Sequence, residues 1–415
     1  MQSADQDRHI MIVGAGQAGG CAAAALRAAG HRGLITMLGD EPHPPYERPP
    51  LSKDLLAGTV EIESTYLRPP EWYREAHVLL RTGSRVADID RVAQRVRMED
   101  GDTLPYDAML IATGARARRL PVPGADGPRV FYLRDIADAL ALRAKLHAGT
   151  RLVVIGAGFI GLEIAAIASK RQAKVVVLER AGHVLARVAA PEVGGYLSAL
   201  HRAHGVEIVH EVGVAGIEDA GTAARVHAAD GRCWEADIVA IGVGAQPNDE
   251  LAGRAGLEIR DGIVVDEFGR TGDPAISAAG DVTRHFNPLL GRHLRLESWQ
   301  NAQNQAAAVA AVMAGGHVPY AEVPWFWTDQ YDTNLQMAGA PLQWDRLVWR
   351  GAPEERAFTV FHLDGEVPVA AVTVNNGRDM RFARQLIAAR EPLDPGLLAD
   401  RTIKLQDLAR QLASH

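Results

Sequence analysis

Apolar and polar positions along the first part of the chain alternate between strand-like and helix-like patterns. The apolar runs at residues 9–13 and 34–38 have the length of buried strands, and the stretch 17–29 between them has helical periodicity that ends at Gly30. A further apolar run, 104–114, predicts a strand that enters a turn. Strand, helix and strand in this order predict a parallel sheet covered by helices.

The same pattern recurs about 142 residues later. Apolar runs at 151–155 and 174–178 flank a helical stretch at 159–171, and the run 236–242 closes this second unit as 104–114 closes the first. This repetition is the main internal symmetry of the chain. It predicts two similar α/β units, each with the Rossmann-like order of elements.

The remaining segments predict a return to the first unit and then a different fold. Residues 271–281 read as a strand followed by a polar turn, and 298–313 as an alanine-rich helix. Beyond Pro324 the aromatic density rises, and a helix at 381–390 is preceded by three predicted strands at 345–349, 358–363 and 367–374. This order predicts a separate α+β domain of about 90 residues.

These patterns predict three domains. Residues 121–127 are rich in proline and glycine, as a crossing between domains often is. We expect one dinucleotide-binding domain from residues 1–115 and 245–323, a second from 116–244, and a C-terminal α+β domain from 324–415. The predicted class is therefore α/β, with two Rossmann-like domains of the glutathione-reductase type and one further domain.

A glycine-rich turn stands between strand and helix in each repeat. The glycines are Gly14, Gly16 and Gly19 in the first turn and Gly156, Gly158 and Gly161 in the second. The first glycine permits a tight turn, the second lets the backbone approach a pyrophosphate, and the third lets helix and strand pack closely. The helix N-terminus then presents N–H groups to the phosphates. Two such turns predict two bound dinucleotides.

Acidic residues follow the second strand of each repeat, where a ribose is usually bound. Asp40 or Glu41 in the first unit and Glu179 in the second can accept hydrogen bonds from a ribose diol. Glu179 would repel a 2′-phosphate and favours NADH over NADPH, whereas the neighbouring Arg180 is the kind of residue that accommodates that phosphate. We expect NADH.

Composition narrows the function classes. The chain of 415 residues has 47% hydrophobic and 23% charged residues, as in ordinary globular proteins. Its net charge of −7 gives no reason to expect nucleic-acid binding. There is no uninterrupted apolar run of 18 residues and no signal-like start, so we expect a cytoplasmic protein without a membrane span.

Cysteine and histidine positions suggest no disulfide framework and no metal site. Cys21 and Cys233 are 212 residues apart, and we interpret both as small buried apolar residues. His201 and His204 have helical spacing but no supporting third ligand, so we expect them on a solvated helix face.

Taken together, these motifs resemble those of the FAD-dependent NADH:ferredoxin reductases of bacterial oxygenase systems over nearly the whole chain. The marks of the resemblance are Pro45–Lys53 (PYERPPLSK), Ala112-Thr113-Gly114, Gly156–Glu163, Ala279-Gly280-Asp281 and Pro324–Tyr331 (PWFWTDQY). The Arg-Pro-Pro-Leu-Ser-Lys and Trp-Phe-Trp segments are the more specific of these marks.

The resemblance implies non-covalent FAD on the first turn and NADH on the second. The residues implied at FAD are Gly14, Gly16, Ala18, Gly19, Asp40, Arg48, Lys53, Val86, Ala112, Thr113, Gly114, Arg134, Gly280, Asp281 and Trp299. Those implied at NADH are Gly156, Gly158, Phe159, Ile160, Gly161, Glu163, Glu179 and Gly242.

Three residues are implied in the reaction itself. Lys53 is a cation that would lie by the reactive ring nitrogen of the flavin, Glu163 would lie near the nicotinamide carboxamide with a salt bridge to Lys53, and Trp327 would cover the site where the partner docks. The implied reaction is hydride transfer from NADH to FAD, then single-electron transfer to a small iron–sulfur protein, expected to be a two-iron ferredoxin that feeds a haem-thiolate monooxygenase or a ring-hydroxylating dioxygenase.

Several alternatives have similar architecture. Disulfide reductases and peroxide-reducing or water-forming oxidases are disfavoured because residues 40–53 contain no cysteine. An NADH:rubredoxin reductase and an apoptosis-inducing-factor-like protein that acts as a redox-dependent binding module remain open. The protein is expected to be a monomer or homodimer, and the basic residues available to an acidic partner are Arg116–Arg119 or Arg378 and Arg381.

Overall fold

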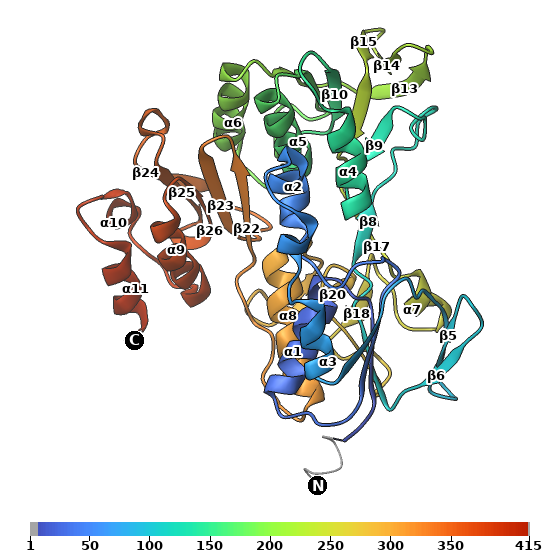
Figure 1. Cartoon of the computed structure of the whole chain (residues 1–415). Coiled ribbons are helices and arrows are strands. Elements are labelled where there is room, and N and C mark those ends of the chain that lie inside the picture. Colours follow the sequence, from blue (N-terminus) through green and yellow to red (C-terminus); the bar gives the residue numbers. More distant parts are fainter. Residues whose placement is uncertain (1–6, 414–415) are drawn as a thin grey trace. The chain divides into compact units, whose positions relative to one another are not determined.

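The computed structural model describes residues 7–413, which form two compact units (Figure 1). The first unit runs up to Arg48 and also contains 62–116 and 245–324. The second contains 49–61, 117–244 and the residues from 325 onward. The chain thus passes between the units several times, and each unit is described by itself below.

A five-stranded parallel sheet forms the centre of the first unit. Its order is β19-β7-β1-β2-β3, with bounds Ile276–Ala278, Ala108–Ile111, Ile10–Val13, Ile35–Leu38 and Val78–Arg81. Ile10 and Ile12 pack on one face against α1 (Gln17–Ala28) and α8 (Trp299–Met313), while Met11 and Val13 pack into the core on the other face. Because alternate residues of a strand face opposite sides, a strand covered on both sides is apolar throughout.

Smaller elements complete the first unit. An antiparallel sheet is formed by β4 (Val86–Asp90), β5 (Arg95–Met98) and β6 (Thr103–Pro105), and a second three-stranded sheet by β18 (Ile263–Val265), β20 (Thr283–Asn287) and β21 (Arg292–Leu294). The helices are α3 (Pro70–Glu75), α7 (Glu250–Arg254) and the 3-10 turn η3 (Ile62–Thr65). The short strands β8 (Ala115–Ala117) and β17 (Ala245–Pro247) occur where the chain crosses between units.

The second unit repeats the parallel sheet. Its order is β12-β11-β10-β16-β9, with bounds Glu207–Val209, Lys174–Leu178, Arg151–Ile155, Ile238–Ile241 and Val130–Tyr132. Helices α4 (Ile136–Lys145), α5 (Phe159–Lys170) and α6 (Pro191–Ala203) belong to this unit. The antiparallel sheet β13 (Val214–Asp219), β14 (Ala224–Ala228) and β15 (Cys233–Ala236) covers the face of Val153 and Ile155.

A five-stranded antiparallel sheet forms the C-terminal part of the second unit. Its order is β22-β23-β26-β25-β24, with bounds Trp325–Gln330, Thr333–Gly339, Val367–Val374, Phe358–Asp364 and Arg346–Arg350. Helices α9 (Gly377–Ala389), α10 (Pro395–Ala399) and α11 (Leu405–Ala413) follow, and η4 (Pro353–Glu355) is a single turn. Phe358 and Val374 join the hydrophobic core that α5 and α6 share, so this sheet is packed onto the second α/β layer.

The segment after Arg48 packs into the second unit. It consists of η2 (Pro49–Ser52) and α2 (Asp54–Ala57), and Leu56 lies fully buried in the core of that unit. Arg143 Nη1 donates to the carbonyl of Leu55 and Arg171 Nη1 to that of Leu56, at 3.3 and 3.1 Å. These bonds tie α2, which follows the prolines of η2, to α4 and to the residue that follows α5.

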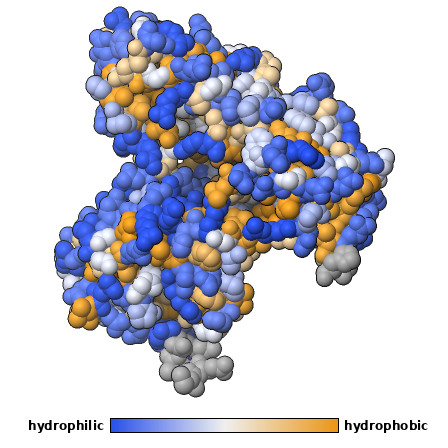
Figure 2. Space-filling view, turned by 180° about the vertical axis from the view of Figure 1, so that it is seen from behind, coloured by the Kyte–Doolittle hydropathy of each residue, from blue (hydrophilic) through white to orange (hydrophobic). Residues whose placement is uncertain are grey.

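No helix within residues 7–413 combines the length and the apolar character needed to span a bilayer. On the face drawn in Figure 2, hydrophilic residues predominate and hydrophobic residues lie scattered among them.

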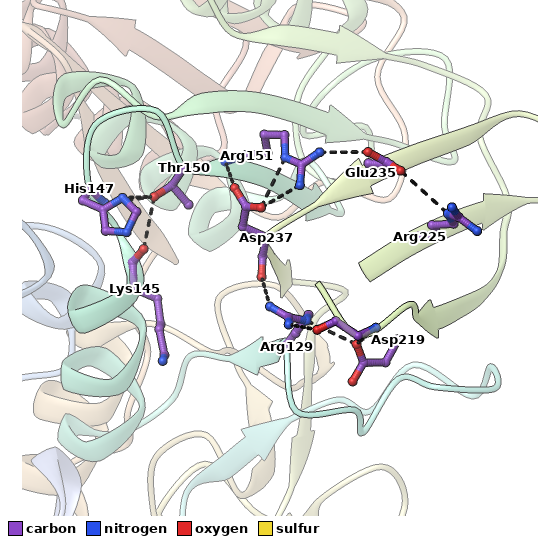
Figure 3. Close-up of polar contacts among 10 residues, drawn as sticks. Arg129, Lys145, His147, Thr150, Arg151, Asp219, Arg225, Glu235 and Asp237 are labelled. Atoms are coloured by element: carbon purple, nitrogen blue, oxygen red, sulfur yellow. Dashed lines mark hydrogen bonds and ion pairs between the residues drawn. The ribbon is translucent and has the colours of Figure 1, made fainter. Parts of the chain in front are cut away.

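Ion pairs connect the start of β10 to the neighbouring antiparallel sheet (Figure 3). Arg151 donates to Asp237 Oδ1 at 2.7 Å and to Glu235 Oε2 at 2.9 Å, and Arg129 Nε donates to Asp219 Oδ1 at 3.2 Å. These side chains are about one-third to one-half exposed, so water and salt screen the pairs and each stabilises the unit only weakly.

Most predicted elements of the α/β repeats are confirmed within one or two residues, but five corrections are needed. The run 104–114 is not one strand, because Tyr106 and Asp107 separate β6 from β7 in different sheets. The hairpin β22–β23 was not predicted, and the helix predicted at 381–390 is α9, which begins at Gly377.

The remaining two corrections concern single residues. His201 is fully buried, because β22 and the following turn pack over α6, so it does not lie on a solvated face. Cys233 is exposed on β15, whereas Cys21 is partly buried in α1. Burial raises the pKa of the Cys21 thiol to about 11.

Candidate functional site

The three glycines of the first turn have different surroundings. A Cβ on Gly14, whose φ is 118°, would lie 2.1 Å from the carbonyl oxygen of Ala112, and a Cβ on Gly19 would lie 2.0 Å from that of Gly14. A Cβ on Gly16 would meet nothing within 4 Å. Two glycines are therefore required by the fold itself, and the middle one borders open space, as a turn that admits a pyrophosphate requires.

Other predicted FAD residues come to this turn from distant parts of the first unit. The Ala112-Thr113-Gly114 segment ends β7, and Gly14 approaches its backbone closely. Gly280 has φ of 85°, and a Cβ there would lie 2.9 Å from the Cβ of Ala18. Its N–H donates to Gln305 Oε1 of α8 at 2.8 Å. The ends of β7 and β19 therefore both reach the start of α1.

Helix α1 begins without a side-chain cap. Its N-cap is Gly16, which has no side chain to accept a hydrogen bond, and its first turn contains no acidic residue. The first N–H groups and the positive end of the helix dipole therefore face the open side of the turn. This chemistry fits an anionic pyrophosphate.

The two acidic candidates for the first ribose differ in their contacts. Glu41 accepts from Arg48 Nη2 at 2.6 Å and from the Tyr46 hydroxyl at 2.5 Å. Burial alone would lower the pKa of Arg48, but Tyr46, Glu41 and Asp281 raise it. Asp40 is exposed and makes no side-chain hydrogen bond or ion pair among residues 7–413. Of the two, Asp40 is the more exposed carboxylate, and all of its acceptor sites are open to a ligand, whereas Glu41 is already held by Arg48 and Tyr46.

The remaining predicted FAD positions are divided between the units. Val86 lies at the edge of the core with 9% exposure, and Trp299 Nε1 donates to Glu47 Oε1 at 3.3 Å at the start of α8. Ser298 caps that helix by accepting from the N–H of Asn301. Lys53 and Arg134, in contrast, belong to the second unit.

The second turn has the same division of roles among its glycines. A Cβ on Gly156, with φ of 100°, would lie 2.5 Å from the carbonyl oxygen of Gly242, and a Cβ on Gly161 would lie 2.0 Å from that of Gly156. Around Gly158 the nearest atom would be 3.9 Å away. Helix α5 begins at Phe159 without a side-chain cap. This turn too admits a pyrophosphate.

Glu179 is held in place by the turn itself. Its Oε2 accepts from the N–H of Ala157 at 2.7 Å and its Oε1 from that of Ala181 at 2.8 Å. Each carboxylate oxygen keeps a second lone pair, so the residue can accept from ribose hydroxyls while its orientation stays fixed. The side chain is half-buried, and its neighbour Arg180 is exposed.

Predicted residues on α5 lie partly at the surface. Ile160 is 42% exposed, and the ring of Phe159 stacks on Phe326 of β22 with centroids 6.2 Å apart. This pair connects the start of α5 to the C-terminal sheet within the second unit.

The predicted salt bridge between Lys53 and Glu163 is confirmed. Lys53 Nζ lies 2.6 Å from Glu163 Oε1, and the Glu163 side chain is only 3% exposed. Ser52 donates to Glu163 Oε2, and Thr328 donates to Oε1 at 2.7 Å. A buried carboxylate is tolerated only where charge and donors compensate it, and here two segments of the chain, at Ser52–Lys53 and at Thr328, supply them.

Ser52 and Thr328 were not among the predicted site residues. Each directly adjoins a predicted one, since Ser52 precedes Lys53 and Thr328 follows Trp327. The available signal was this adjacency, together with the need of a buried carboxylate for hydroxyl donors.

Trp327 lies on β22 beside a second tryptophan. Its ring stacks on Trp325 with centroids 5.1 Å apart, and both are half-buried. The guanidinium of Arg384 on α9 lies 5.8 Å from the centre of the Trp325 ring. The strand thus presents a partly exposed aromatic pair beside a basic helix.

The packing around the second turn leads to opposite predictions for two Gly→Ala substitutions. Gly156→Ala should lower the melting temperature of the protein by several degrees, because a positive φ costs about 1–3 kcal/mol and the new Cβ meets a backbone carbonyl. Gly158→Ala should melt as the unsubstituted protein does, yet raise the KM for NADH by obstructing the pyrophosphate.

Thermal unfolding without added nucleotide and steady-state kinetics measure the two effects. Equal melting temperatures of the two variants would contradict the packing argument, and an unchanged KM for Gly158→Ala would remove the second turn from the NADH site.

Comparison with known proteins identifies two family matches. Residues 8–306 match the pyridine nucleotide-disulphide oxidoreductase family, and residues 325–409 match the reductase C-terminal family. The chain is 46% identical to the ferredoxin–NAD(+) reductase component of the anthranilate 1,2-dioxygenase system of Burkholderia cepacia, covering 96% of this chain and 98% of that protein. It is 43% identical to rhodocoxin reductase of Rhodococcus erythropolis, covering 98% and 96%.

Solved structures show the same fold. The reductase in the covalent putidaredoxin reductase–putidaredoxin complex matches with a TM-score of 0.94 and 40% identity, covering 98% of this chain and 99% of that one. A ferredoxin reductase of Rhodopseudomonas palustris matches with a TM-score of 0.94 and 38% identity, covering 97% and 99%.

The predicted fold class and the predicted resemblance are both confirmed. The parallel sheets of both units have the Rossmann-like order, and the C-terminal part has its own family match. The chain belongs to the pyridine nucleotide-disulphide oxidoreductase family, in the group that contains the ferredoxin–NAD(+) reductases of oxygenase systems.

Proposed function

We propose that the protein is an FAD-dependent oxidoreductase that transfers electrons from NADH to a small ferredoxin-type iron–sulfur protein, which in turn feeds an oxygenase. The observation that carries this proposal is the segment Arg48–Lys53, which provides a lysine in a buried ion pair and contains no cysteine. A relative with 46% identity is named as such a reductase of a dioxygenase system, which supports the same assignment.

The chain supplies binding and electrostatics rather than redox side chains. Bound FAD provides the capacity to take up two electrons as a hydride and to release them singly. Gly16 and Gly158 leave room for the two pyrophosphates, and Asp40 and Glu179 accept from the two riboses. The protein binds FAD non-covalently, and we assign the further FAD contacts, Arg134 among them, on the family resemblance.

The domain assignment follows the same division of roles. We propose that residues 1–115 and 245–323 bind FAD, that 116–244 bind NADH, and that 324–415 form the C-terminal domain.

We place the protein in the cytoplasm. The reason is that NADH, the electron donor proposed for this protein, is a cytoplasmic metabolite.

An anaerobic titration tests the proposed reaction. The FAD-loaded protein should lose its yellow absorbance on stoichiometric addition of NADH, and the reduced protein should then reduce a two-iron ferredoxin. Rubredoxin serves as the comparison acceptor. Failure to bleach would refute the proposed function, whereas bleaching followed by reduction of rubredoxin alone would favour the rubredoxin reductase alternative.

Substitution of Glu179 tests the nicotinamide site. Glu179→Ala should raise the KM for NADH more than it lowers kcat, because it removes a contact to the ribose rather than one made only in the transition state. The preference for NADH over NADPH should also fall. An unchanged KM in steady-state assays with both nucleotides would exclude this role.

Between the two basic regions considered for docking, we favour the one on α9. Arg378 and Arg381 are both exposed there, and the acidic residue between them, Asp379, is turned inward to Arg350 at 3.3 Å. The exposed charge of this segment is therefore positive, which suits an acidic ferredoxin.

The rival region carries less uncompensated charge. Arg116 forms an ion pair with Glu250, and Arg119 forms one with Asp126. We propose a docking surface made of Arg378, Arg381, Trp325 and Trp327, in which the half-buried indoles are the anchors.

Charge reversal compares the two regions directly. Arg378→Glu with Arg381→Glu should raise the KM for the ferredoxin about ten-fold at low salt, since rim charges act mainly on encounter, and the effect should shrink as salt increases. Reduction of ferricyanide should not change. Arg118→Glu with Arg119→Glu is the matched control, and a larger effect there would place the docking surface in the rival region.

A further inference from the structure

A chain of buried polar side chains leads away from Glu163 inside the second unit. Thr328 Oγ1 lies 2.7 Å from Glu163 Oε1, and Gln330 Nε2 lies 3.1 Å from Thr328 Oγ1. Gln330 Oε1 lies 2.8 Å from His201 Nε2, and the Tyr331 hydroxyl lies 3.2 Å from His201 Nδ1. The chain joins α5, β22, the turn after β22 and α6.

Burial makes these contacts obligatory. Thr328 and Gln330 are each 1% exposed, His201 is 0% exposed and Glu163 is 3% exposed. A polar group in such a place costs free energy unless it is hydrogen-bonded, and every polar side-chain atom in the run from Glu163 to His201 has a partner.

The chemistry of the groups fixes the direction of every hydrogen bond. The ionised carboxylate of Glu163 only accepts, so the hydroxyl of Thr328 donates to it and accepts from the amide N–H of Gln330. The amide oxygen of Gln330 then accepts from His201, which places the imidazole proton on Nε2. His201 Nδ1 is left to accept from the Tyr331 hydroxyl.

This series of hydrogen bonds orients the side chains that form it and does not transfer protons along its length. The amide of Gln330 stands in its middle, and an amide does not exchange protons in the way that a hydroxyl or an imidazole does. Burial lowers the pKa of His201 to about 4, so the imidazole is neutral near pH 7. All donors therefore point permanently toward Glu163.

We propose that Thr328, Gln330 and His201 are positioning residues that hold the Glu163 carboxylate in the orientation in which it pairs with Lys53. The proposal rests on the proposed function, in which the Lys53–Glu163 pair serves the oxidation of NADH. His201 fixes the amide of Gln330, Gln330 fixes the rotation of the Thr328 hydroxyl, and Thr328 fixes Glu163 Oε1, the same oxygen that Lys53 contacts.

The first test measures reduction of bound FAD by NADH in anaerobic stopped flow. Thr328→Val should lower the limiting rate constant about five-fold, which is the factor equivalent to the roughly 1 kcal/mol of one hydrogen bond. The NADH concentration that gives half of the limiting rate should change less than two-fold. Thr328→Ser, which keeps the hydroxyl, should restore the rate. A Thr328→Val rate equal to that of the unsubstituted protein, or a Thr328→Ser rate as low as that of Thr328→Val, would overturn the proposal.

Thr373 offers a matched control for the same isosteric change. It lies fully buried on β26 of the same sheet, and its hydroxyl has no hydrogen-bond partner among the described residues. Thr373→Val should therefore leave the rate unchanged. A loss of rate equal to that of Thr328→Val would mean that burial of a valine in this sheet, and not the bond to Glu163, causes the effect.

A double-mutant cycle tests whether Gln330 acts through Thr328. Gln330→Met alone should lower the rate as Thr328→Val does. The double variant should be no slower than Thr328→Val, because both substitutions remove the same support of the Glu163 carboxylate. If the two substitutions acted independently, their effects on the rate would multiply to about 25-fold. That result would refute the proposal that Gln330 acts through Thr328.

A spectroscopic test needs no turnover. Histidine-selective ¹⁵N NMR of the FAD-loaded protein, assigned with His201→Gln, should show His201 at pH 7 as neutral with its proton on Nε2. The opposite tautomer would reverse the hydrogen bond between His201 and Gln330, and a charged ring would remove the acceptor for the Tyr331 hydroxyl. Either result would refute the proposal. If NADH fails to reduce the flavin while the tautomer is as expected, the proposed function falls and the orientation of the chain stands.

Discussion

The buried carboxylate of Glu163 is the constraint on which the second unit depends. An ionised group at 3% exposure requires an opposite charge and hydrogen-bond donors, and it obtains them from Ser52, Lys53 and Thr328. These residues come from segments more than 100 positions away on either side of α5. Removal of one partner from a buried pair typically costs about 3–5 kcal/mol, so the segment that contains Ser52 and Lys53 and strand β22 are both bound to the first half of α5.

This requirement explains why residues 49–61 belong with the second unit. Sequence order alone assigns them to the first α/β repeat, between β2 and β7. Leu56 joins the core of the second unit, and Arg143 of α4 and Arg171, directly after α5, donate to carbonyl groups of α2. A segment can therefore leave its own repeat when its donors and its apolar side chains are satisfied elsewhere.

Local signals carried most of the successful sequence predictions. The roles of the glycines at Gly14, Gly16 and Gly19 follow from spacing within one turn, and strands β1 and β10 follow from continuous apolar runs. Contacts between distant segments were harder to predict. His201 was expected on a solvated helix face because no third ligand supported a metal site there, and the contacts with Gln330 and Tyr331 that accompany its burial come from a distant part of the sequence.

Other misses have the same origin. Cys233 was expected to be buried because of its residue type, but its side chain points outward from β15. Glu41 and Asp40 were equivalent in sequence, and the contacts of Glu41 with Arg48 and Tyr46 distinguish them in the structure. Thr328 and Ser52 became recognisable as site residues only once Glu163 was known to be buried between them.

Neighbouring residues of strand β22 contribute to two different sites, the aromatic pair at the surface and the buried polar contacts of Glu163. Trp327 belongs to the half-buried aromatic pair, while Thr328 and Gln330 face inward and Asp329 faces out. Side chains alternate with a period of two, so a slip of one residue in the pairing with β23 would bring Asp329 inward in place of its neighbours. The hairpin turn at Tyr331, whose φ is 59°, fixes that pairing. Insertions and deletions should therefore be rarer in this turn than their surface position suggests, because one added residue would affect the partner surface and the carboxylate pair together.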